Sequence, residues 1–322
     1  MKIAVTGGSG FIGTNLIDRL ILHGFEVVNF DIKPPRFDSH KSIWKMVDLC
    51  DLKSISSALE EFSPGYIVNL AAVTDIREND EISHYSVNFL GVKNLVVASA
   101  KCPRLKRIIF ASTMLVNATG PNNNGKSDYG PNTLYGKSKV MGENVVSDFA
   151  EQLPSYCIVR PTSIWGEWFG EPYKDFFQYV RSGRYLHVGR KSCTKTYGYV
   201  KNTAYQIHKL LLADEDDVSG RVFYLGDKPA INIELWANEI AECFGIRKPK
   251  RLPFWLFRFA GYFGDLLEHY GFRFPITSFR LRNMTTDNEV DLTPIYEVAG
   301  EPPVSRIDGV KNTVRWLRND SR

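Results

Sequence analysis

Short apolar runs alternate with amphipathic stretches through the first half of the chain. The runs are rich in valine, isoleucine and phenylalanine, and each is long enough for one buried strand. An alternation of this kind predicts a doubly wound, parallel α/β sheet covered by helices on both faces. The predicted strands are Lys2 to Thr6, Glu26 to Phe30, Ile43 to Val47, Tyr66 to Leu70, Arg107 to Ala111 and Tyr156 to Arg160.

The alternation becomes irregular after about Gly166, where proline and aromatic residues become frequent. We therefore expect a first domain over residues 1–165 and a smaller, substrate-binding lobe over residues 166–322. The stretch from Val200 to Ala213 has a helical pattern, so residues 196–215 are the candidate segment for a return to the first domain.

Composition narrows the classes of function. The formal net charge of +4 is spread over 322 residues without a block of like charges, so we expect no nucleic-acid partner. The five cysteines and six histidines lack the spacing of a zinc site, and no metal is expected. The N-terminus has no signal-peptide pattern and no run reaches the roughly 18 apolar residues of a bilayer span, which predicts a cytoplasmic protein.

A glycine-rich turn follows the first predicted strand. The segment from Thr6 to Gly13 reads T-G-G-S-G-F-I-G and leads into a predicted helix. Glycine allows a tight turn and close approach of the backbone to phosphate, and the N–H groups at a helix N-terminus bind the anion. Asp31 ends the second strand, where a carboxylate meets adenosine ribose hydroxyls. The context predicts a Rossmann-type site for NAD, although Lys33 and Arg36 weaken the exclusion of NADP.

Tyr135 and Lys139 are four residues apart at the start of a predicted helix, so they project from one face. Thr113 follows the fifth strand, at the edge where such sheets bind ligands. A tyrosine with an ordinary pKa near 10 must shift by roughly three units, about 4 kcal/mol, to act as a base near neutrality. Positive charge on Lys139 and on oxidised nicotinamide favours the phenolate. The three residues predict hydride transfer to or from a carbon bearing oxygen.

Together these motifs resemble the extended short-chain dehydrogenase/reductase family, and within it the nucleotide-sugar epimerase and dehydratase branch. The resemblance covers nearly the whole chain and includes N-L-A-A at 69–72, V-N at 87–88 and R-P at 160–161. It implies a homodimer, with Thr113, Tyr135 and Lys139 as the catalytic residues. The cofactor contacts that it implies are Gly7, Gly10, Phe11, Ile12, Gly13, Asp31, Asp48, Leu49, Leu70, Ala71, Ala72, Asn88, Ser112, Tyr135, Lys139 and Pro161. The substrate contacts that it implies are Thr74, Thr113, Tyr135, Ser163, Lys195 and Tyr199.

The residues after Thr113 separate the branches of this family. The 4,6-dehydratases carry an Asp-Glu pair there to remove water, whereas Met114 and Leu115 of this chain cannot transfer a proton. Enzymes similar to GDP-fucose synthase add a Cys and a His for 3,5-epimerisation; Leu115 occupies the Cys position and no His follows Arg160 nearby. The remaining set of tyrosine, lysine, threonine and nicotinamide suits a sugar 4-epimerase, and equally the one-way reduction of a 4-keto sugar.

Asp31 indicates NAD, and NAD favours the epimerase over the reductase. Biosynthetic reduction more often uses NADPH, whereas an epimerase takes a hydride and returns it, so it can keep its NAD bound. Such an enzyme acts through a transient 4-keto intermediate on a hexose or N-acetylhexose joined to a nucleotide or polyprenyl diphosphate. Two positions depart from the family: Lys195 replaces the usual arginine of the substrate-phosphate segment, and Ser163 replaces the asparagine of many UDP-sugar epimerases. A hydroxysteroid-type dehydrogenase and a non-catalytic NAD-binding regulator remain alternatives from other classes.

The last third resembles bacterial epimerases that convert N-acetylglucosamine to N-acetylgalactosamine on an undecaprenyl diphosphate carrier in O-antigen synthesis. The similarity lies in D-K-P at 227–229, the tract from Leu252 to Leu267, and T-S-F-R at 277–280. Residues 251–274 are rich in aromatic and basic side chains, which is typical of a peripheral contact with the inner membrane. The alternative is that these aromatic residues form the core of the small lobe or a contact between subunits.

Overall fold

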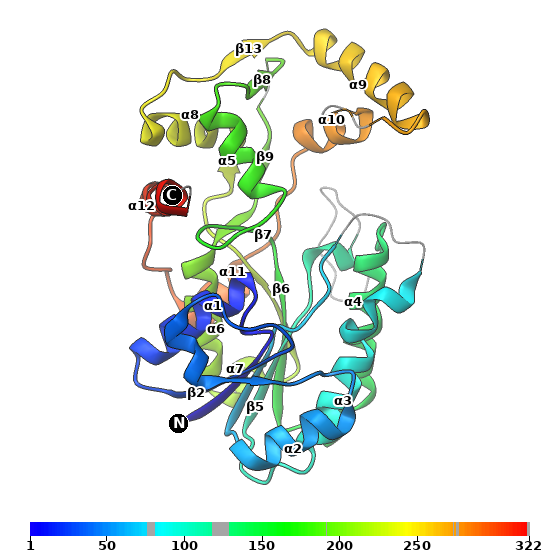
Figure 1. The fold of residues 1–322 in the computed structure, drawn as a ribbon, viewed down its shortest axis with the longest axis vertical. Helices are drawn as coiled ribbons and strands as arrows, with labels where there is room; N and C mark the ends of the chain where they lie inside the picture. Colours follow the sequence, from blue (N-terminus) through cyan, green and yellow to red (C-terminus); the bar gives the residue numbers. More distant parts are fainter. Residues whose placement is uncertain (76–80, 118–128, 191, 273, 275–276, 321–322) are drawn as a thin grey trace.

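A parallel sheet of seven strands forms the centre of the larger lobe (Figure 1). The computed structural model describes residues 1–75, 81–117, 129–190, 192–272, 274 and 277–320. The strands are β1 (Lys2–Thr6), β2 (Glu26–Asp31), β3 (Trp44–Met46), β4 (Tyr66–Asn69), β5 (Arg107–Ala111), β6 (Ser155–Pro161) and β11 (Arg221–Leu225). The strand order is β11-β6-β5-β4-β1-β2-β3, so successive strands are added toward one edge from β1 to β3 and toward the other edge from β4 onward. This confirms the doubly wound parallel sheet that the sequence predicts.

The six predicted strands all form, and their ends differ from the prediction by at most one residue. The seventh strand, β11, is not among the predicted strands. It pairs in parallel with β6, with Arg221 opposite Cys157 and Leu225 opposite Pro161. Because β11 lies in the irregular half of the sequence, its local pattern does not show that it completes the first sheet.

Helices cover both faces of the sheet, and each face buries its own apolar cluster. Successive strand side chains point to opposite sides, so Val5 and Ile109 join one cluster while Ala4 and Ile108 join the other. The helices of the first face are α1 (Phe11–Leu22), α6 (Val200–Leu212) and α11 (Thr293–Ala299), and those of the second are α2 (Leu52–Phe62), α3 (Leu90–Ser99) and α4 (Leu134–Asp148). Short helices in the connections are α7 (Glu215–Val218), η1 (Asp38–Ile43), η2 (Ile82–Asn88), η3 (Met114–Val116) and η4 (Ala150–Gln152).

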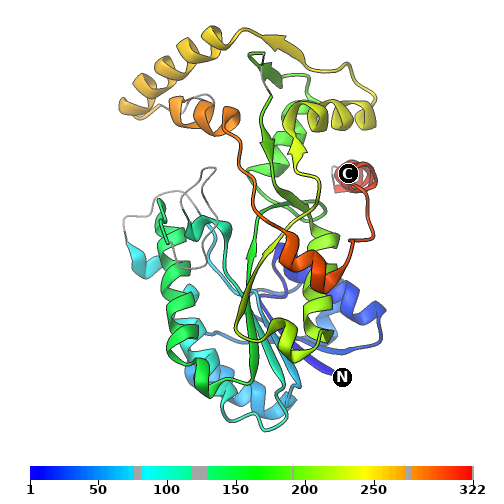
Figure 2. The ribbon, with the colours of Figure 1, turned by 180° about the vertical axis from the view of Figure 1, so that it is seen from behind.

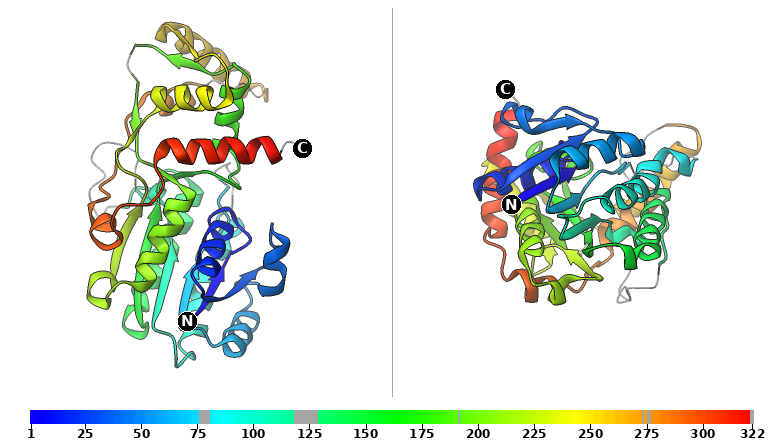
Figure 3. Two further views of the ribbon diagram at one scale, coloured as in Figure 1. Left: turned by 90° about the vertical axis from the view of Figure 1, so that its left-hand side faces the viewer. Right: turned by 90° about the horizontal axis from the view of Figure 1, so that it is seen from below.

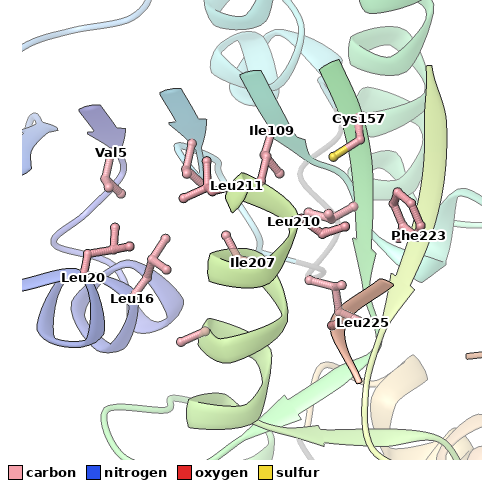
Figure 4. Close-up of a cluster of buried hydrophobic side chains, with 14 of the residues drawn as sticks. Val5, Leu16, Leu20, Ile109, Cys157, Ile207, Leu210, Leu211, Phe223 and Leu225 are labelled. Atoms are coloured by element: carbon pink, nitrogen blue, oxygen red, sulfur yellow. The ribbon is translucent and has the colours of Figure 1, made fainter. Parts of the chain in front are cut away.

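Helix α6 returns from the second half of the sequence to the larger lobe. Its side chains Ile207, Leu210 and Leu211 pack in one cluster with Leu16 and Leu20 of α1 (Figure 4). All five are at most 1% exposed. The structure thus places α6 within the segment 196–215 against the first sheet, next to the helix that follows the glycine turn.

An aromatic core holds the smaller lobe together. Trp165, Phe177, Tyr199 and Trp236 are fully buried in it, and the ring centroids of the two tryptophans lie 5.3 Å apart. The lobe pairs β7 (Ser163–Trp165) with β10 (Tyr197–Tyr199), β8 (Leu186–Val188) with β13 (Lys250–Leu252), and β9 (Thr194–Lys195) with β12 (Ile231–Asn232). Its helices are α5 (Tyr173–Arg181), α8 (Ile233–Phe244), α9 (Phe254–His269), α10 (Ser278–Thr285) and α12 (Arg306–Asp320) (Figures 2 and 3). Of the helices that the structure describes, none combines the length and the apolar character that crossing a membrane requires.

Candidate active site

The glycine turn joins β1 to α1 and packs against the chain that leaves β4. Gly7 has a φ of +69°, and a Cβ there would lie 2.5 Å from the backbone nitrogen of Ala71. A Cβ at Gly13 would lie 2.4 Å from the carbonyl oxygen of Gly7. Gly10 precedes α1 and provides no side-chain cap for its N–H groups, as is typical of helix starts that bind anions. The turn therefore fits the pyrophosphate of a dinucleotide.

The carboxylate of Asp31 borders this turn. It accepts hydrogen bonds from the backbone N–H groups of Ser9, at 3.0 Å, and Lys33, at 2.9 Å. Arg36 donates to the backbone oxygens of Ser9, at 3.1 Å, and Trp168, at 3.0 Å. A carboxylate fixed at the end of β2, next to the turn, fits the ribose hydroxyls of NAD.

Asn88 ties the loop after β4 to the start of α4. Its side chain exchanges two hydrogen bonds with the backbone of Val73, at 3.0 and 2.9 Å, and donates a third to the hydroxyl of Ser138 at 2.8 Å. These bonds hold Asn88, an expected cofactor contact, between the loop after β4 and α4. Asp48 and Leu49, two further expected cofactor contacts, follow β3, where Leu49 is buried and Asp48 is exposed.

Two local features set the position of the catalytic helix α4. Thr133 caps it, because its hydroxyl accepts a hydrogen bond from the N–H of Gly136 at 3.0 Å. Gly136 also lets the helix approach the chain after β5, since a Cβ there would lie 2.4 Å from the carbonyl oxygen of Leu115. The first two turns of α4, with Tyr135 and Lys139, are therefore held against the carboxyl end of β5.

The structure brings the three predicted catalytic residues together at this strand end. The hydroxyl of Thr113 lies close enough to the phenol of Tyr135 to lower its pKa. The ammonium of Lys139 donates to the backbone oxygen of Ala111 at 2.8 Å. Tyr135, Thr113 and Lys139 are all buried. The arrangement holds a phenol, a hydroxyl and an ammonium group at the edge of the sheet where a ligand binds.

Burial decides the protonation of these groups. It raises the pKa of Tyr135 to about 12, and the hydrogen bond with Thr113 opposes this only in part. Burial also lowers the pKa of Lys139 to about 8, while the carboxylate of Glu143 acts in the opposite direction. In the chain alone, desolvation disfavours both the phenolate and the ammonium, so the shift of the Tyr135 pKa toward neutrality, which also depends on oxidised nicotinamide, stays a prediction. The base form needs additional positive charge beside the phenol.

A buried ion pair lies one helical turn beyond Lys139. Arg160 of β6 donates to the carboxylate of Glu143 through Nε at 3.0 Å and through a terminal nitrogen at 2.7 Å. The hydroxyls of Ser112 and Tyr129 donate to the same carboxylate. Sequence analysis missed Glu143, although its position four residues after the lysine placed it on the catalytic face of α4. Glu143 holds Ser112, an expected cofactor contact, next to the catalytic helix.

The expected substrate residues fall into different settings. Thr74 is exposed in the loop after β4, Ser163 begins β7 directly after the end of β6, and Lys195 is half-buried in β9. Tyr199 is fully buried, and its hydroxyl donates to the carboxylate of Glu167 at 2.8 Å. Tyr199 therefore lies in the aromatic core of the smaller lobe. Within the described ranges, no group of three or more His, Cys, Asp or Glu side chains is arranged to hold a metal ion.

A family model described as the NAD dependent epimerase/dehydratase family matches residues 3–226. The chain belongs to the NAD dependent epimerase/dehydratase family. This confirms the family that the motifs predict. The matched residues include the glycine turn, Thr113 and the helix with Tyr135 and Lys139. The protein is accordingly an enzyme, and its cofactor is NAD.

Several known proteins are similar to this chain over 77% to 100% of its length. The N-acetyl-alpha-D-glucosaminyl-diphospho-ditrans,octacis-undecaprenol 4-epimerase of Escherichia coli O157:H7 is 27% identical, over 98% of this chain and 95% of that protein. A 3-beta-hydroxysteroid dehydrogenase of Mycolicibacterium neoaurum is 28% identical, over 77% of this chain and 71% of that protein. The crystal structure of UDP-glucose 4-epimerase from Thermotoga maritima, with UDP-glucose, is 21% identical with a TM-score of 0.77, covering 100% of both chains. UDP-glucuronic acid 4-epimerase from Bacillus cereus, in complex with NAD, is 18% identical with a TM-score of 0.77 and the same coverage.

Proposed function

We propose that the protein is a sugar 4-epimerase acting on a hexose or N-acetylhexose joined to a diphosphate carrier. The observation that carries the proposal is the burial of Tyr135, Thr113 and Lys139 side by side at the carboxyl end of β5. Lys139 follows one helical turn later, with its ammonium held on the last residue of the same strand. The site thus contains one group that moves a proton, one that holds the sugar oxygen, and one that supplies positive charge.

The residues of the chain divide the work of the reaction. When bound, oxidised NAD supplies a positive charge and an acceptor for the hydride of C4, which is later returned. Tyr135 takes the proton of the 4-hydroxyl, and Thr113 holds the same oxygen by a hydrogen bond. The ammonium of Lys139 favours the phenolate while it exists. After the 4-keto sugar has turned in the site, Tyr135 returns the proton to the oxygen, and the configuration at C4 is inverted.

The segment after Thr113 supports a reaction that is confined to C4. It forms the short helix η3, in which Met114 and Val116 are buried. Removal of water from a neighbouring carbon requires an acid and a base, and neither methionine, leucine nor valine can serve as one. The η3 side chains therefore favour epimerisation, or reduction of a 4-keto sugar, over dehydration.

We further propose that the sugar is an N-acetylhexosamine and that the carrier is a polyprenyl diphosphate used in surface polysaccharide (O-antigen) synthesis. The likeness to the undecaprenol 4-epimerase of Escherichia coli O157:H7 covers 98% of this chain and so includes the smaller lobe. Lys195 in that lobe offers a positive charge to the diphosphate. A lipid-linked substrate places the enzyme, as a homodimer, at the cytoplasmic side of the inner membrane.

The test is incubation of the purified protein and NAD with UDP-N-acetylglucosamine and, separately, with N-acetylglucosaminyl diphosphate polyprenol. We expect the C4 epimer to form from the polyprenyl substrate without accumulation of NADH. Accumulating NADH with a hydroxysteroid would instead support the second candidate, a dehydrogenase, which the likeness to the Mycolicibacterium neoaurum enzyme favours. If no sugar diphosphate is converted, the protein is not an epimerase of this kind.

A further inference from the structure

Helix α9 carries an apolar face that the described part of the chain leaves uncovered. Trp255, Phe259, Tyr262, Phe263 and Leu266 are between 53% and 68% exposed. At about 100° per residue, these five positions fall within one sector of the helix, about 100° wide. Single exposed apolar residues are ordinary, but a contiguous patch of this kind indicates a contact surface.

The opposite side of α9 is already used for packing. Phe257, Gly261 and Gly264 are buried, and α10 packs against α9, where a Cβ at Gly261 would lie 3.3 Å from the backbone nitrogen of Ser278. Helix α9 lies at one end of the long axis of the molecule, with α10 on its inner side (Figures 1 and 2). The exposed aromatic face is therefore not the core of the smaller lobe, which was one of the two alternatives that the sequence left open. Residue 273 of the tract 251–274 lies outside the described residues.

The charge around the aromatic face favours a bilayer as its partner. Arg247, Lys248 and Lys250 precede α9, Arg258 lies beside the aromatic sector, and all four are exposed. The sequence from 243 to 264 contains no Asp or Glu, whereas Asp265 and Glu268 are exposed near the C-terminal end of α9, so the basic side chains lie toward its N-terminal end. Basic residues next to an interfacial aromatic face suit anionic headgroups.

The α9–α10 unit is joined to the segment that holds Lys195. The thiol of Cys193 donates to the backbone oxygen of Met284 at 2.9 Å, and the N–H of Thr194 donates to the carboxylate of Asp287 at 2.8 Å. A polyprenyl diphosphate keeps its phosphates at the headgroup level and its chain in the bilayer. If α9 docks on the bilayer and Lys195 contacts the diphosphate, the two must keep a fixed position relative to one another. The bonds from Cys193 and Thr194 to the α10 region provide this link.

We propose that α9 lies in the plane of an anionic bilayer surface, with its aromatic face among the lipid headgroups and acyl chain ends. Its 16 residues would cover about 24 Å of the surface. Docking in this orientation presents the diphosphate of a lipid-linked sugar to the lobe that carries Lys195. The role in substrate delivery rests on the proposed function, whereas the binding of α9 to lipid does not.

The test measures flotation of the protein with vesicles of phosphatidylethanolamine and phosphatidylglycerol, without NAD or sugar. We expect the wild type to float with these vesicles at low salt, and the double variant Trp255→Ser, Phe259→Ser to lose roughly ten-fold or more of the bound fraction. The matched control is the double variant Leu22→Ser, Leu235→Ser, whose side chains are 83% and 56% exposed elsewhere on the surface. We expect it to float like the wild type.

Three results would overturn the proposal. The first is a wild type that does not float at low salt. The second is a double variant of α9 that floats as well as the wild type. The third is a dimer in solution that the α9 variant converts to a monomer while neither protein binds vesicles, which would make α9 a subunit contact. Because epimerisation is assayed separately, on a short-chain prenyl diphosphate that needs no vesicle, a failure of docking is distinguishable from a failure of the proposed function.

Discussion

At the scale of the residue, burial of the catalytic phenol has a direct consequence. The protein alone holds Tyr135 in its protonated form, since burial raises its pKa to about 12. Positive charge added beside the phenol would favour removal of its proton, which would couple the proposed base to the oxidised cofactor. A site built in this way does not hold a permanent phenolate before the cofactor binds.

The first prediction concerns the substitution Tyr135→Phe. It removes only the hydroxyl, so we expect NAD affinity to stay at the wild-type value and kcat to fall by about 10²–10⁴-fold. Isothermal titration with NAD and a steady-state epimerase assay measure the two quantities. The control is Tyr179→Phe on the exposed side of α5, which should change neither. A Tyr135→Phe enzyme with wild-type turnover would show that another group is the base.

The second prediction concerns how far the buried charge of Lys139 lowers the free energy of unfolding. Its pKa is 10.5 when unperturbed and about 8 in the folded protein. A lowered pKa of this kind means that stability is complete above pH 10.5 and is lost as the pH falls through about 8. Below that pH the loss is about 3 kcal/mol, offset by about 1 kcal/mol from the hydrogen bond to Ala111.

We therefore expect Lys139→Met to have a free energy of unfolding about 2 kcal/mol higher than the wild type at about pH 7, with the advantage gone at about pH 10. Urea unfolding at the two pH values measures this. A variant that is less stable than the wild type at neutral pH would contradict the inference that the buried ammonium of Lys139 destabilises the folded protein.

The proximity of Tyr135, Lys139 and Thr113 could be predicted because its signal is local. Tyr135 and Lys139 are separated by one helical turn, and Thr113 follows an obvious strand. Glu143 could not be assigned by the same reasoning, because a carboxylate on a helix is ordinarily solvated. Its burial depends on Arg160 of β6, which the sheet brings within 2.7 Å.

At the scale of the element, the β1–α1 turn shows what the glycines are for. Gly7 and Gly24 both have positive φ values, +69° and +77°. A Cβ at Gly24 would meet nothing within 4 Å, whereas a Cβ at Gly7 would meet the backbone of Ala71 at 2.5 Å. The two positions therefore separate conformational strain from steric exclusion.

The third prediction uses this pair. Gly24→Ala should lower the free energy of unfolding by about 1 kcal/mol and leave NAD binding unchanged. Gly7→Ala should cost roughly 1–3 kcal/mol more and also weaken NAD binding, because the loop after β4 must move away from the turn. Thermal unfolding and NAD titration of both variants provide the measurement. Equal effects of the two substitutions would show that the close contact at Gly7 is not required.

Elements differ in how far the sequence predicts them. Strands β1 to β6 stand in regular alternation with helices, and their ends are predicted to within one residue. Strand β11 has a similar composition, but it does not lie in a regular alternation of strands and helices. Its place beside β6 is determined by pairing with residues more than 60 positions earlier in the chain. Helix α6 was detectable because Ile207, Leu210 and Leu211 form an apolar stripe that must be buried somewhere.

At the scale of the whole molecule, the two lobes contain different parts of the proposed site. The larger lobe contains the glycine turn proposed to bind the cofactor, and helix α4 with the proposed catalytic residues Tyr135 and Lys139. The smaller lobe surrounds an aromatic core and ends in α9, at the far end of the molecule (Figure 3). Composition alone could not separate buried from exposed aromatic residues, since Trp236 and Trp255 have the same chemistry but are 1% and 57% exposed. Only the packing of α10 on α9 shows which face remains outside.

The measurement that tests the central claim most directly follows the hydrogen on C4. The substrate is N-acetylglucosaminyl diphosphate polyprenol with deuterium at C4, incubated with the enzyme and NAD in ordinary water. We predict that the epimerised product keeps its deuterium at C4, because the same hydride leaves and returns within one bound site. Loss of the deuterium to solvent, or its accumulation in reduced cofactor, would contradict the account.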